Sequence, residues 1–527
     1  MKLLDIKNGI SPQWAEKGYQ MPQFDIEAVR AKTHQAPVWV HFGAGNLFRA
    51  FPAAVLQQAL DSGKYDRGVI VAEGFDFEII DKAYAPYDNL SLLVCLQSDG
   101  NIQKKVIASV TESLKADARF EADWARLAEI FENPSLQMIS FTITEKGYAV
   151  APADLERGLE PVLIMGKVTL LLYERFLAGK LPLTVQSMDN CSHNGDRVKA
   201  AVIAYASKWA EEGLVPGEFL EYVQDPAKVS YPWSMIDKIT PRPDGKVQKM
   251  LAEDGFEDNY TIITDKRTYT APFVNAEETE YLVIEDDYTN GRPPLELGGV
   301  LYVDRETVDK VERMKVCTCL NPLHTTLAVY GCLLGYEKIS EEMKDEELTR
   351  MIRTIGLKEG LPVVVNPGVL DPKEFIDTVL DVRFPNPFMP DTPQRIATDT
   401  SQKLAIRFGE TVKAYQASEQ LNTADLKLIP LVFAGWLRYL TGIDDKGNSF
   451  TLSPDPLLDT VCPYVADLKP GEACDVEKKV KPILENEKIF GVNLYEAGMA
   501  EAVCGYLEEM LAGPGAVRAT LQKYVTD

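Results

Sequence analysis

The chain has 527 residues, of which 46% are hydrophobic and 25% are charged, a composition typical of a folded globular protein rather than a disordered one. Its 79 acidic and 55 basic residues give a formal charge of −24, which would repel both a nucleic-acid backbone and an anionic membrane surface. We therefore expect no nucleic-acid partner and no membrane association and, without an evident signal peptide or membrane-spanning run, a cytoplasmic protein of two or three domains.

The first clear unit of the sequence predicts a strand, a helix and a second strand. Val38–Phe42 and Val69–Ala72 are apolar, β-branched runs, and the segment between them has a helical pattern. Gly43 would let the chain turn sharply off the first strand, and Gly45 would let the backbone approach a pyrophosphate at the start of the helix. Glu73 would accept hydrogen bonds from an adenosine ribose and repel a 2′-phosphate. This pattern favours NAD over NADP.

This turn departs from the GxGxxG fingerprint, because Phe48 stands where the third glycine is usual. We therefore expect the helix to pack less closely on the strand. The alternative is a plain strand, turn and helix with no ligand. The two flanking strands and Glu73 favour a cofactor site over that alternative.

Two further strands are predicted in Met138–Tyr148 and Leu181–Asn190, with a helix in Pro161–Leu177 between them. Each strand begins with an apolar run and ends in polar residues. Because open parallel sheets bind ligands at the carboxyl ends of their strands, we expect polar side chains from both strands to line the site. These side chains are Thr144, Glu145, Asp189 and Asn190.

The Pro/Gly-rich stretch Asn290–Gly299 marks the expected domain boundary. Residues 1–290 are predicted to form a Rossmann-type α/β domain that binds NAD. Residues 291–527 are predicted to form a mostly α-helical domain for substrate binding and catalysis. The helical patterns of the second domain cover Thr307–Leu334, Glu341–Ile355, Pro393–Ser418, Leu426–Thr441 and Tyr495–Tyr524.

The stretch KVCTCLNPLH allows two interpretations. Cys317, Cys319 and His324 would form a metal site, but no fourth ligand is near and CxC lacks the usual ligand spacing, so buried cysteines are favoured and no metal is expected. Lys315, Asn321 and His324 would form an acid/base site, in which Asn321 and His324 share a helical face. From periodicity alone, a solvated lysine and a core histidine are favoured over the acid/base site.

Lys315 points away from Asn321 and His324 on a regular helix, because it lies six and nine residues before them. Pro322 has no N–H to continue the helical ladder, so it predicts a new helix start at Asn321 or a disrupted turn there. A single extra residue in a helix is commonly absorbed as a π-bulge, often at functional sites. Either feature would turn the Lys315 side chain toward Asn321 and His324.

Two other segments carry polar residues of interest. Asp237 lies in a proline-bounded stretch, Tyr231–Pro243. In the segment after Pro390, Asp391 is predicted to cap a helix that places Arg395, Asp399 and Lys403 on one face. The simplest interpretation of that face is a row of surface ion pairs.

Taken together, these stretches resemble the polyol-specific long-chain dehydrogenase/reductase family, or mannitol dehydrogenase family. The turn HFGAGNLFRAF, the strand SFTITEKGY, the segment SMDNCSHNGD and the blocks YPWSMIDKITPRP, VIEDDYTNGRPPLELGGV and DTPQRIATDTSQK resemble its motifs. They occur in collinear order from about Val38 to beyond Lys403, which is most of the chain.

The resemblance implies an NAD-dependent enzyme in which a lysine is the general base, two asparagines form an oxyanion hole and a histidine orients the substrate. By motif, the catalytic residues would be Lys315, Asn190, Asn321 and His324. The implied substrate-binding residues are Asp237, Arg395, Lys403 and Glu312, the last being a carboxylate beside the lysine. The expected cofactor-binding residues are Gly43, Gly45, Asn46, Leu47, Arg49, Glu73, Thr144, Glu145 and Asn190.

The chain has five residues between Lys315 and Asn321 where the family has four. Length and sequence style resemble the uronate branch most, so we expect NADH-dependent reduction of D-fructuronate to D-mannonate, with tagaturonate reduction or mannitol 2-dehydrogenation as alternatives. A sugar-acid or polyol substrate and a monomer or small homo-oligomer are expected. Two other classes stay open: a non-catalytic NAD- or sugar-binding sensor, in which the extra residue disables the base, and a zinc protein.

Overall fold

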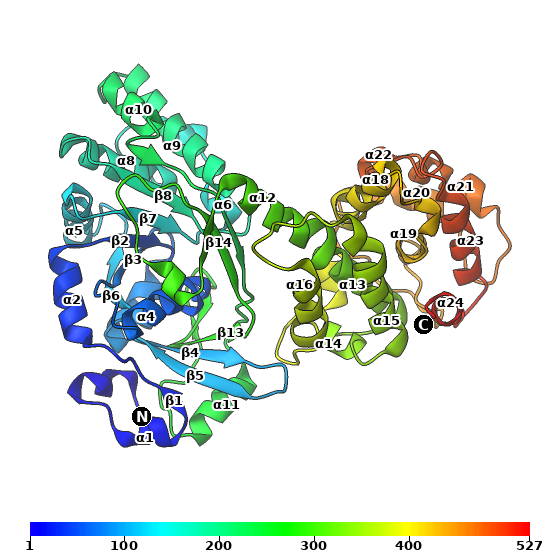
Figure 1. The fold of residues 1–527 in the computed structure, drawn as a ribbon, viewed down its shortest axis with the longest axis horizontal. Helices are drawn as coiled ribbons and strands as arrows, with labels where there is room; N and C mark the ends of the chain where they lie inside the picture. Colours follow the sequence, from blue (N-terminus) through cyan, green and yellow to red (C-terminus); the bar gives the residue numbers. More distant parts are fainter. Residues whose placement is uncertain (527) are drawn as a thin grey trace. The chain divides into compact units, whose positions relative to one another are not determined.

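The computed structural model describes residues 1–526. The chain divides into two compact units, residues 1–309 and residues 310–527 (Figure 1). Residues 291–309, which the sequence analysis assigns to the second domain, pack with the first unit instead. The reason is a β-strand, β15, in this segment that pairs with β14 of the first unit. No helix in the described part of the chain is both long and apolar enough to cross a bilayer.

The first unit is built on a six-stranded parallel sheet in the order β6-β3-β2-β7-β8-β9. Numbered by their place along the chain, these strands follow the order 3-2-1-4-5-6 of a doubly wound dinucleotide-binding fold, with the switch point between β2 and β7. The expected α/β Rossmann-type fold is therefore confirmed. The strands are β2 (Trp39–Phe42), β3 (Val69–Glu73), β6 (Val110–Lys115), β7 (Met138–Phe141), β8 (Leu183–Ser187) and β9 (Val229–Ser230).

Both faces of this sheet are buried, because helices cover each of them. Alternate side chains along a strand point to opposite faces and so contact different helices. Val40 and Ile70 pack with α5, α8, α9 and α10, whereas Trp39 and Val71 pack with α2 and α4. Figure 1 shows the first set of helices above the sheet and α2 and α4 beside and below it. These helices are α2 (Ile26–Gln35), α4 (Pro52–Asp61), α5 (Glu121–Glu132), α8 (Ile164–Leu177), α9 (Asn194–Glu211) and α10 (Gly217–Gln224).

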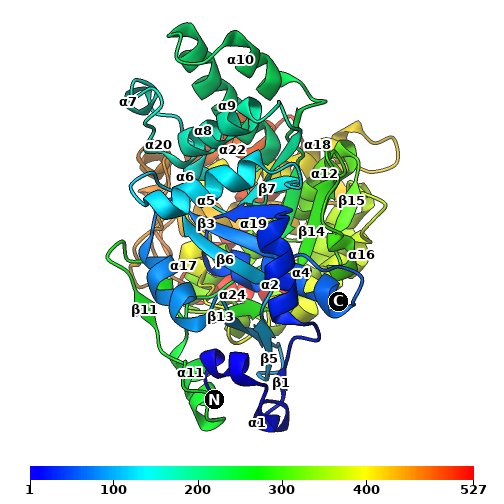
Figure 2. The same ribbon diagram turned by 90° about the vertical axis from the view of Figure 1, so that its left-hand side faces the viewer.

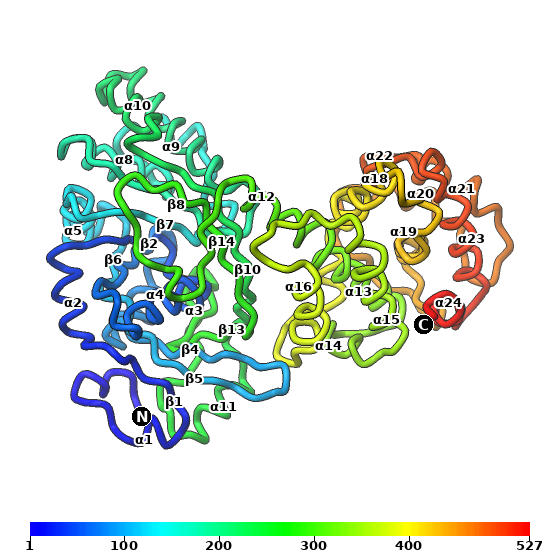
Figure 3. Tube along the Cα trace, viewed as in Figure 1, coloured from blue at the N-terminus to red at the C-terminus, as the bar shows by residue number. Residues whose placement is uncertain are grey.

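Three smaller sheets extend the first unit. One has the order β1-β5-β4-β13 and lies near α1 and α11 at the end of the unit that carries the N-terminus (Figures 1 and 2). Another, β10-β14-β15, pairs segments distant in sequence, as the chain trace in Figure 3 shows for β10 and β14. Their strands are β1 (Tyr19–Gln20), β4 (Ser91–Leu96), β5 (Ile102–Ile107), β10 (Ser234–Asp237), β11 (Ile262–Ile263), β12 (Tyr269–Thr270), β13 (Phe273–Glu277), β14 (Tyr281–Glu285) and β15 (Leu301–Val303).

Five short helices complete the unit or lead out of it. The helix predicted to follow the glycine turn is in fact two helices, because Pro52 starts a new one after a break at Phe51. The short helices are α1 (Pro12–Glu16), α3 (Asn46–Ala50), α6 (Thr144–Gly147), α7 (Pro152–Leu155) and α11 (Gly245–Glu253). Helix α12 (Arg305–Met314) spans the division between the units.

The second unit is mostly helical, as expected, and has no β-strand of two or more residues in its described part. Its central helix, α13 (Asn321–Leu334), is almost entirely buried and packs against α15, α17 and α19. Figure 1 labels α13, α15 and α19 within this unit. The other helices are α14 (Ile339–Glu342), α15 (Glu346–Thr354), α16 (Pro372–Thr378), α17 (Pro393–Ile396), α18 (Glu410–Ala417), α19 (Leu428–Tyr439), α20 (Leu458–Val465), α21 (Val476–Leu484), α22 (Glu487–Phe490), α23 (Ala500–Met510) and α24 (Ala516–Tyr524). Four π-helical turns occur in this unit: Lys315–Cys319, Ile355–Gly360, Val379–Arg383 and Ala405–Gly409.

A buried carboxyl group lies against the central helix. Neither oxygen of Glu342 has a hydrogen-bond partner within residues 1–526. Gly331 of α13 makes room for it, because a Cβ atom there would lie 2.3 Å from Glu342 Oε1. Burial, and to a lesser extent the charge of Asp345, raises the pKa of Glu342 well above its usual 4.5. The protonated form is therefore the one that this site favours.

We expect Glu342→Gln to stabilise the protein progressively as the pH rises. Because the folded pKa of Glu342 is raised, its contribution to stability is fully present below the unfolded pKa near 4.5 and is lost as the pH rises through the folded pKa. The free energy lost is about 1.4 kcal/mol per pH unit in that range. The check is the melting temperature of both proteins from pH 4.5 to 8.5.

Glu341→Gln is the matched control, since Glu341 is the exposed neighbour on the same helix. Its effect on the melting temperature should not grow with pH. If the difference between Glu342→Gln and the unmodified protein is the same at every pH, the carboxyl is not held protonated.

Candidate active site

The glycine turn after β2 has the geometry that a bound dinucleotide requires. Gly43 has φ +106°, and a Cβ atom there would lie 2.3 Å from the carbonyl oxygen of Thr142, so only glycine fits. Gly45 has φ −74°, and a Cβ atom there would meet nothing within 4 Å. Helix α3 begins directly afterwards at Asn46. Gly43 therefore shapes the turn, while Gly45 leaves open space beside it, where a pyrophosphate would approach the backbone.

Glu73 ties the end of β3 to this turn. Its Oε2 accepts a hydrogen bond from the N–H of Ala44 at 2.8 Å, and its Oε1 accepts from the N–H groups of Phe75 and Asp76 at 2.8 and 3.0 Å. Burial raises the pKa of Glu73, and these backbone hydrogen bonds oppose the rise. A carboxylate has about four acceptor positions, so capacity for one further donor remains.

Arg49, expected to bind cofactor, is instead fully buried and bound to the protein itself. It donates hydrogen bonds to the carbonyl oxygen of Ala271, the Thr270 hydroxyl and the Asn46 side chain, at 2.7, 2.7 and 2.9 Å. Asn46 in turn donates to the carbonyl oxygen of Tyr269 at 3.1 Å. Arg49 and Asn46 therefore fasten α3 to the segment around β12, and Leu47 lies half-buried between them.

Phe48 explains how this turn forms without a third glycine. Its ring is fully buried and stacks on the imidazole of His41, with ring centroids 4.2 Å apart. His41 bonds to Ser140 and Thr142 on the neighbouring strand, and burial lowers its pKa to about 3, so it is neutral. An aromatic pair thus joins helix to strand where close backbone contact is usual.

The turn after β7 is held by the buried carboxylate of Asp189 from the end of β8. Asp189 accepts hydrogen bonds from the N–H groups of Ile143 and Thr144, both at 2.9 Å, and from the hydroxyl of Tyr148. Thr144 has φ +63°, a left-handed conformation that costs a β-branched residue energy and is often found at functional sites. Glu145 is exposed and forms an ion pair with Arg197 at 2.9 Å.

Asn190 follows Asp189 and is exposed at the carboxyl end of β8, as expected. Four residues later, the fully buried Asn194 donates hydrogen bonds to the carbonyl oxygens of Asp189 and Ser234 at 3.0 Å and accepts one from the N–H of Ser234 at 2.9 Å. Asp237 is buried at the end of β10. Asn194 was not predicted as a site residue, although its motif was noted, and it fixes the Asn190 loop to β10.

In the second unit, the predicted π-bulge is confirmed. Lys315–Cys319 form a π-helical turn, in which the N–H of Leu320 donates to the carbonyl oxygen of Lys315 at 3.1 Å. Helix α13 then starts anew at Asn321, with Pro322 in its first turn, as the missing N–H predicts. The extra residue between Lys315 and Asn321 is therefore absorbed within this turn. Lys315 is buried, and Glu312 lies three residues before it on α12.

The cysteines of this turn are buried. Burial raises the pKa of the Cys317 thiol to about 11, and it raises that of Cys319 further, so both are held as thiols. The Cys319 thiol faces the carbonyl oxygen of Pro372 at 3.7 Å. Within residues 1–526, no group of three or more His, Cys, Asp or Glu side chains has the geometry to hold a metal ion.

His324 contacts the buried carboxylate of Asp391, a residue that the sequence predicts as a helix cap. Its Nε2 lies 3.3 Å from Asp391 Oδ2, without the alignment of a hydrogen bond, and its ring packs on Phe384. Burial lowers the pKa of His324, Asp391 raises it, and the charges of Arg407 and Arg395 lower it, with a net lowering. Burial acts to raise the pKa of Asp391, but His324 and Arg395 outweigh it and lower that pKa.

The prediction that Asp391 caps a long helix is wrong. Thr392 is the N-cap, since its hydroxyl accepts from the N–H of Arg395 at 3.2 Å, and α17 ends at Ile396. Asp399 then adopts a left-handed conformation with φ +56°, which breaks the helix. Arg395, Asp399 and Lys403 therefore share no continuous helix face. Asp391 instead contacts His324 and forms an ion pair with Arg395.

Two cations follow along the chain. Lys403 donates to the carbonyl oxygen of Thr398, and burial together with the charge of Arg407 lowers its pKa. Arg407, in the π-helical turn Ala405–Gly409, was not predicted as a site residue. It donates a hydrogen bond to the hydroxyl of Thr325 at 2.5 Å, and burial lowers its pKa to about 10. Only the fold could reveal it, because no sequence motif links Arg407 to α13.

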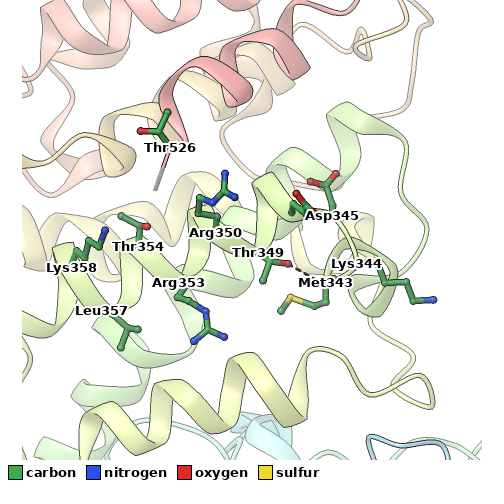
Figure 4. A pocket seen from close by; sticks show the side chains of 11 residues that line it. Met343, Lys344, Asp345, Thr349, Arg350, Arg353, Thr354, Leu357, Lys358 and Thr526 are labelled. Atoms are coloured by element: carbon green, nitrogen blue, oxygen red, sulfur yellow. Dashed lines mark hydrogen bonds between the residues drawn. The ribbon is translucent and has the colours of Figure 1, made fainter.

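A separate pocket of about 610 Å³ in the second unit contains none of the predicted site residues. It is lined by α15 and the π-helical turn after it, and Figure 4 shows Arg350, Thr354 and Lys358 in succession along one helix. Arg350 donates to the carbonyl oxygen of Val525, and Arg353 pairs with Asp381. This pocket is therefore not part of the predicted acid/base site.

Both units match known proteins. A family model described as mannitol dehydrogenase Rossmann domain matches residues 38–297, and one described as mannitol dehydrogenase C-terminal domain matches residues 307–511. A D-mannonate oxidoreductase of Thermotoga maritima is 50% identical over 525 residues, which cover 97% of each chain. A D-sorbitol dehydrogenase structure is 26% identical, with a TM-score of 0.79 over 96% of this chain and 97% of its own. Pseudomonas fluorescens mannitol 2-dehydrogenase, in a ternary complex with NAD and D-mannitol, is 25% identical, with a TM-score of 0.69 over 99% of each chain.

The two glycines of the turn should respond differently to alanine. Gly43→Ala should lower the melting temperature, since the left-handed conformation alone costs about 1–3 kcal/mol and the new Cβ atom meets Thr142. Gly45→Ala should leave the melting temperature unchanged but weaken NADH binding by about tenfold, or about 1.4 kcal/mol. Thermal melts and fluorescence titration with NADH measure both effects. NADH binding that is unaffected in Gly45→Ala would place the cofactor elsewhere.

Asp391→Asn should shift the protonation of His324 to lower pH, because Asp391 is the group that raises its pKa while burial, Arg407 and Arg395 lower it. The chain has only four histidines, so NMR of histidine-labelled protein can follow each ring through a pH titration. Asp399→Asn is the control, since no contact joins Asp399 to His324 in the described residues. A His324 titration that is identical in Asp391→Asn and the unmodified protein would contradict the effect of Asp391 on the pKa of His324.

Proposed function

The chain belongs to the mannitol dehydrogenase family, and from this premise we propose that it is an NAD-dependent reductase that converts D-fructuronate and NADH into D-mannonate and NAD. The observation that carries the proposal is the 50% identity, over 97% of both chains, to a D-mannonate oxidoreductase. The family resemblance inferred from the motifs is confirmed by the same comparisons. We further propose that the enzyme works in the cytoplasm as a monomer or small homo-oligomer.

The first unit fits NAD. Its strand order places the switch point beside the Gly43 turn, Gly45 leaves space for the pyrophosphate, and Glu73 offers a carboxylate where the adenosine ribose would lie. The same carboxylate would repel the 2′-phosphate of NADP. Arg49 supports this site indirectly, by fixing α3. NADH, when bound, supplies the hydride for the keto carbon.

The protein's own residues would transfer the proton and stabilise the negative charge on the substrate oxygen. We propose that the Lys315 ammonium gives its proton to the former keto oxygen during reduction and, when neutral, takes it back in the reverse direction. The side-chain amides of Asn190 and Asn321 would donate hydrogen bonds to the oxygen as negative charge develops on it. His324, held by Asp391, would orient a substrate hydroxyl, and Asp237, Glu312, Arg395 and Lys403 would complete the substrate contacts.

The π-helical turn favours a working enzyme over a sensor. The sensor hypothesis assumes that the extra residue before Asn321 disables Lys315. That residue is absorbed in a regular π-turn, Lys315 stays buried, and Asn321 opens α13. Tagaturonate reduction and mannitol 2-dehydrogenation remain alternative activities of the same site, and a substrate panel separates them.

The test is NADH oxidation with D-fructuronate, D-tagaturonate and D-fructose. The unmodified protein should prefer D-fructuronate, and Lys315→Ala should lower kcat by about a hundredfold or more, because a positioned acid/base group contributes about that factor. Lys338→Ala, at an exposed position of the same unit, is the control and should keep full activity. NADH binding without turnover of any of the three sugars would instead support a sensor.

A further inference from the structure

Arg407 is a half-buried arginine with no carboxylate partner among residues 1–526. Its one side-chain hydrogen bond is the donation from Nη1 to the Thr325 hydroxyl at 2.5 Å. Burial alone lowers its pKa to about 10, and no acidic group acts to raise it. Arginines removed from water in this way are usually paired with an anion.

Two fully buried arginines, by contrast, each donate several hydrogen bonds to the protein itself. Arg438 donates to three carbonyl oxygens and a hydroxyl, and Arg175 donates to four carbonyl oxygens. Arg407 uses one of its five N–H donors, and none of its nitrogens is among the sealed atoms that lack a partner. Its unused donors are therefore not sealed from solvent.

Arg407 lies next to the residues expected to hold substrate. The Thr325 hydroxyl that accepts its hydrogen bond itself donates to the carbonyl oxygen of Asn321 at 2.9 Å. The charge of Arg407 also lowers the pKa of both His324 and Lys403. The guanidinium is therefore joined to the first turn of α13, where the expected oxyanion donor and the expected orienting histidine stand.

The carboxylate that contacts His324 is already engaged. Asp391 contacts His324 and forms an ion pair with Arg395, and its pKa is lowered by both. No hydrogen bond or ion pair joins it to Arg407 in the described residues. Arg407 thus carries a positive charge with no ion-pair partner among the described residues, in a half-buried setting where a ligand carboxylate could accept charge-assisted hydrogen bonds from it.

We propose that Arg407 binds the carboxylate of the keto sugar acid and is the residue that selects sugar acids over uncharged ketoses and polyols. The inference rests on the proposed function and names the group that recognises its substrate class. A planar guanidinium presents two parallel N–H donors that match the two oxygens of a carboxylate. An uncharged ketose would leave those donors desolvated and unpaired, which disfavours its binding.

The test compares Arg407→Met with the unmodified enzyme on D-fructuronate and D-fructose. Arg407→Met should lower kcat/KM for D-fructuronate by about a hundredfold, as expected for loss of one partner of a buried charged pair, and change that for D-fructose by less than about threefold. Arg407→Lys keeps the positive charge but lacks the planar pair of N–H donors, so its kcat/KM for D-fructuronate should lie between those of Arg407→Met and the unmodified enzyme. Competitive inhibition by D-mannonate and by D-mannitol measures binding alone. In Arg407→Met, inhibition by D-mannonate should weaken, whereas inhibition by D-mannitol should not change.

Two further variants guard against a purely structural effect. Thr325→Val removes the hydroxyl that positions Arg407 and should lower kcat/KM for D-fructuronate more than for D-fructose. Arg353→Met removes an exposed arginine of the same unit, paired with Asp381, and should alter neither substrate. Thermal melts of every variant establish that it is folded.

The outcomes separate this inference from the proposed function. If the unmodified enzyme reduces D-fructuronate and Arg407→Met loses activity equally on both sugars, or on neither, the role of Arg407 is refuted while the function stands. If the unmodified enzyme reduces D-fructose but no keto sugar acid, both are refuted. A selective loss for D-fructuronate and for D-mannonate binding supports the assignment.

Discussion

Buried carboxylates that accept hydrogen bonds from backbone N–H groups hold turns and a helix start in place in the two units. Glu73 accepts from Ala44 in the glycine turn and from Phe75 and Asp76 just after β3, and Asp189 accepts from two N–H groups at the turn after β7. Glu359 accepts from the N–H groups of Lys427, Leu428 and Ile429 at the start of α19. An N–H left without a partner inside a protein costs about 1–3 kcal/mol. One carboxylate therefore satisfies several groups and fixes the conformation of a loop that has no regular structure.

The second constraint is the π-helical turn at Lys315–Cys319. An additional residue in a helix must either shift everything after it or be absorbed locally, and here a bulge absorbs it. Pro322 assists, because α13 can start anew where no N–H is needed. Lys315 thus keeps a buried position on a rigid element, although its spacing from Asn321 differs from that of the family.

Charge is distributed unevenly around His324. One buried carboxylate, Asp391, contacts both His324 and Arg395, while the charge of Arg407 lowers the pKa of Lys403. A protein with a formal charge of −24 has acidic residues to spare, yet it places none against Arg407 within its described residues. An anionic substrate would complete this arrangement, so the local surplus of positive charge has a chemical use.

The sequence by itself determined the features that depend on local backbone preferences. Gly43 and Gly45 predicted the turn off β2, apolar runs predicted β2, β3, β7 and β8, and the extra residue together with Pro322 predicted the π-turn and the start of α13. Only the tertiary structure decided the strand order, the partners of Glu73 and Arg49, the end of α17 at Ile396, and the contacts of Asp391 and Arg407. The reason is physical. A residue's φ and ψ preferences depend on its own side chain and on its neighbours along the chain. The partner of a buried charge, by contrast, comes from segments tens to hundreds of residues away, and the periodicity of the sequence does not indicate which segments will pack together.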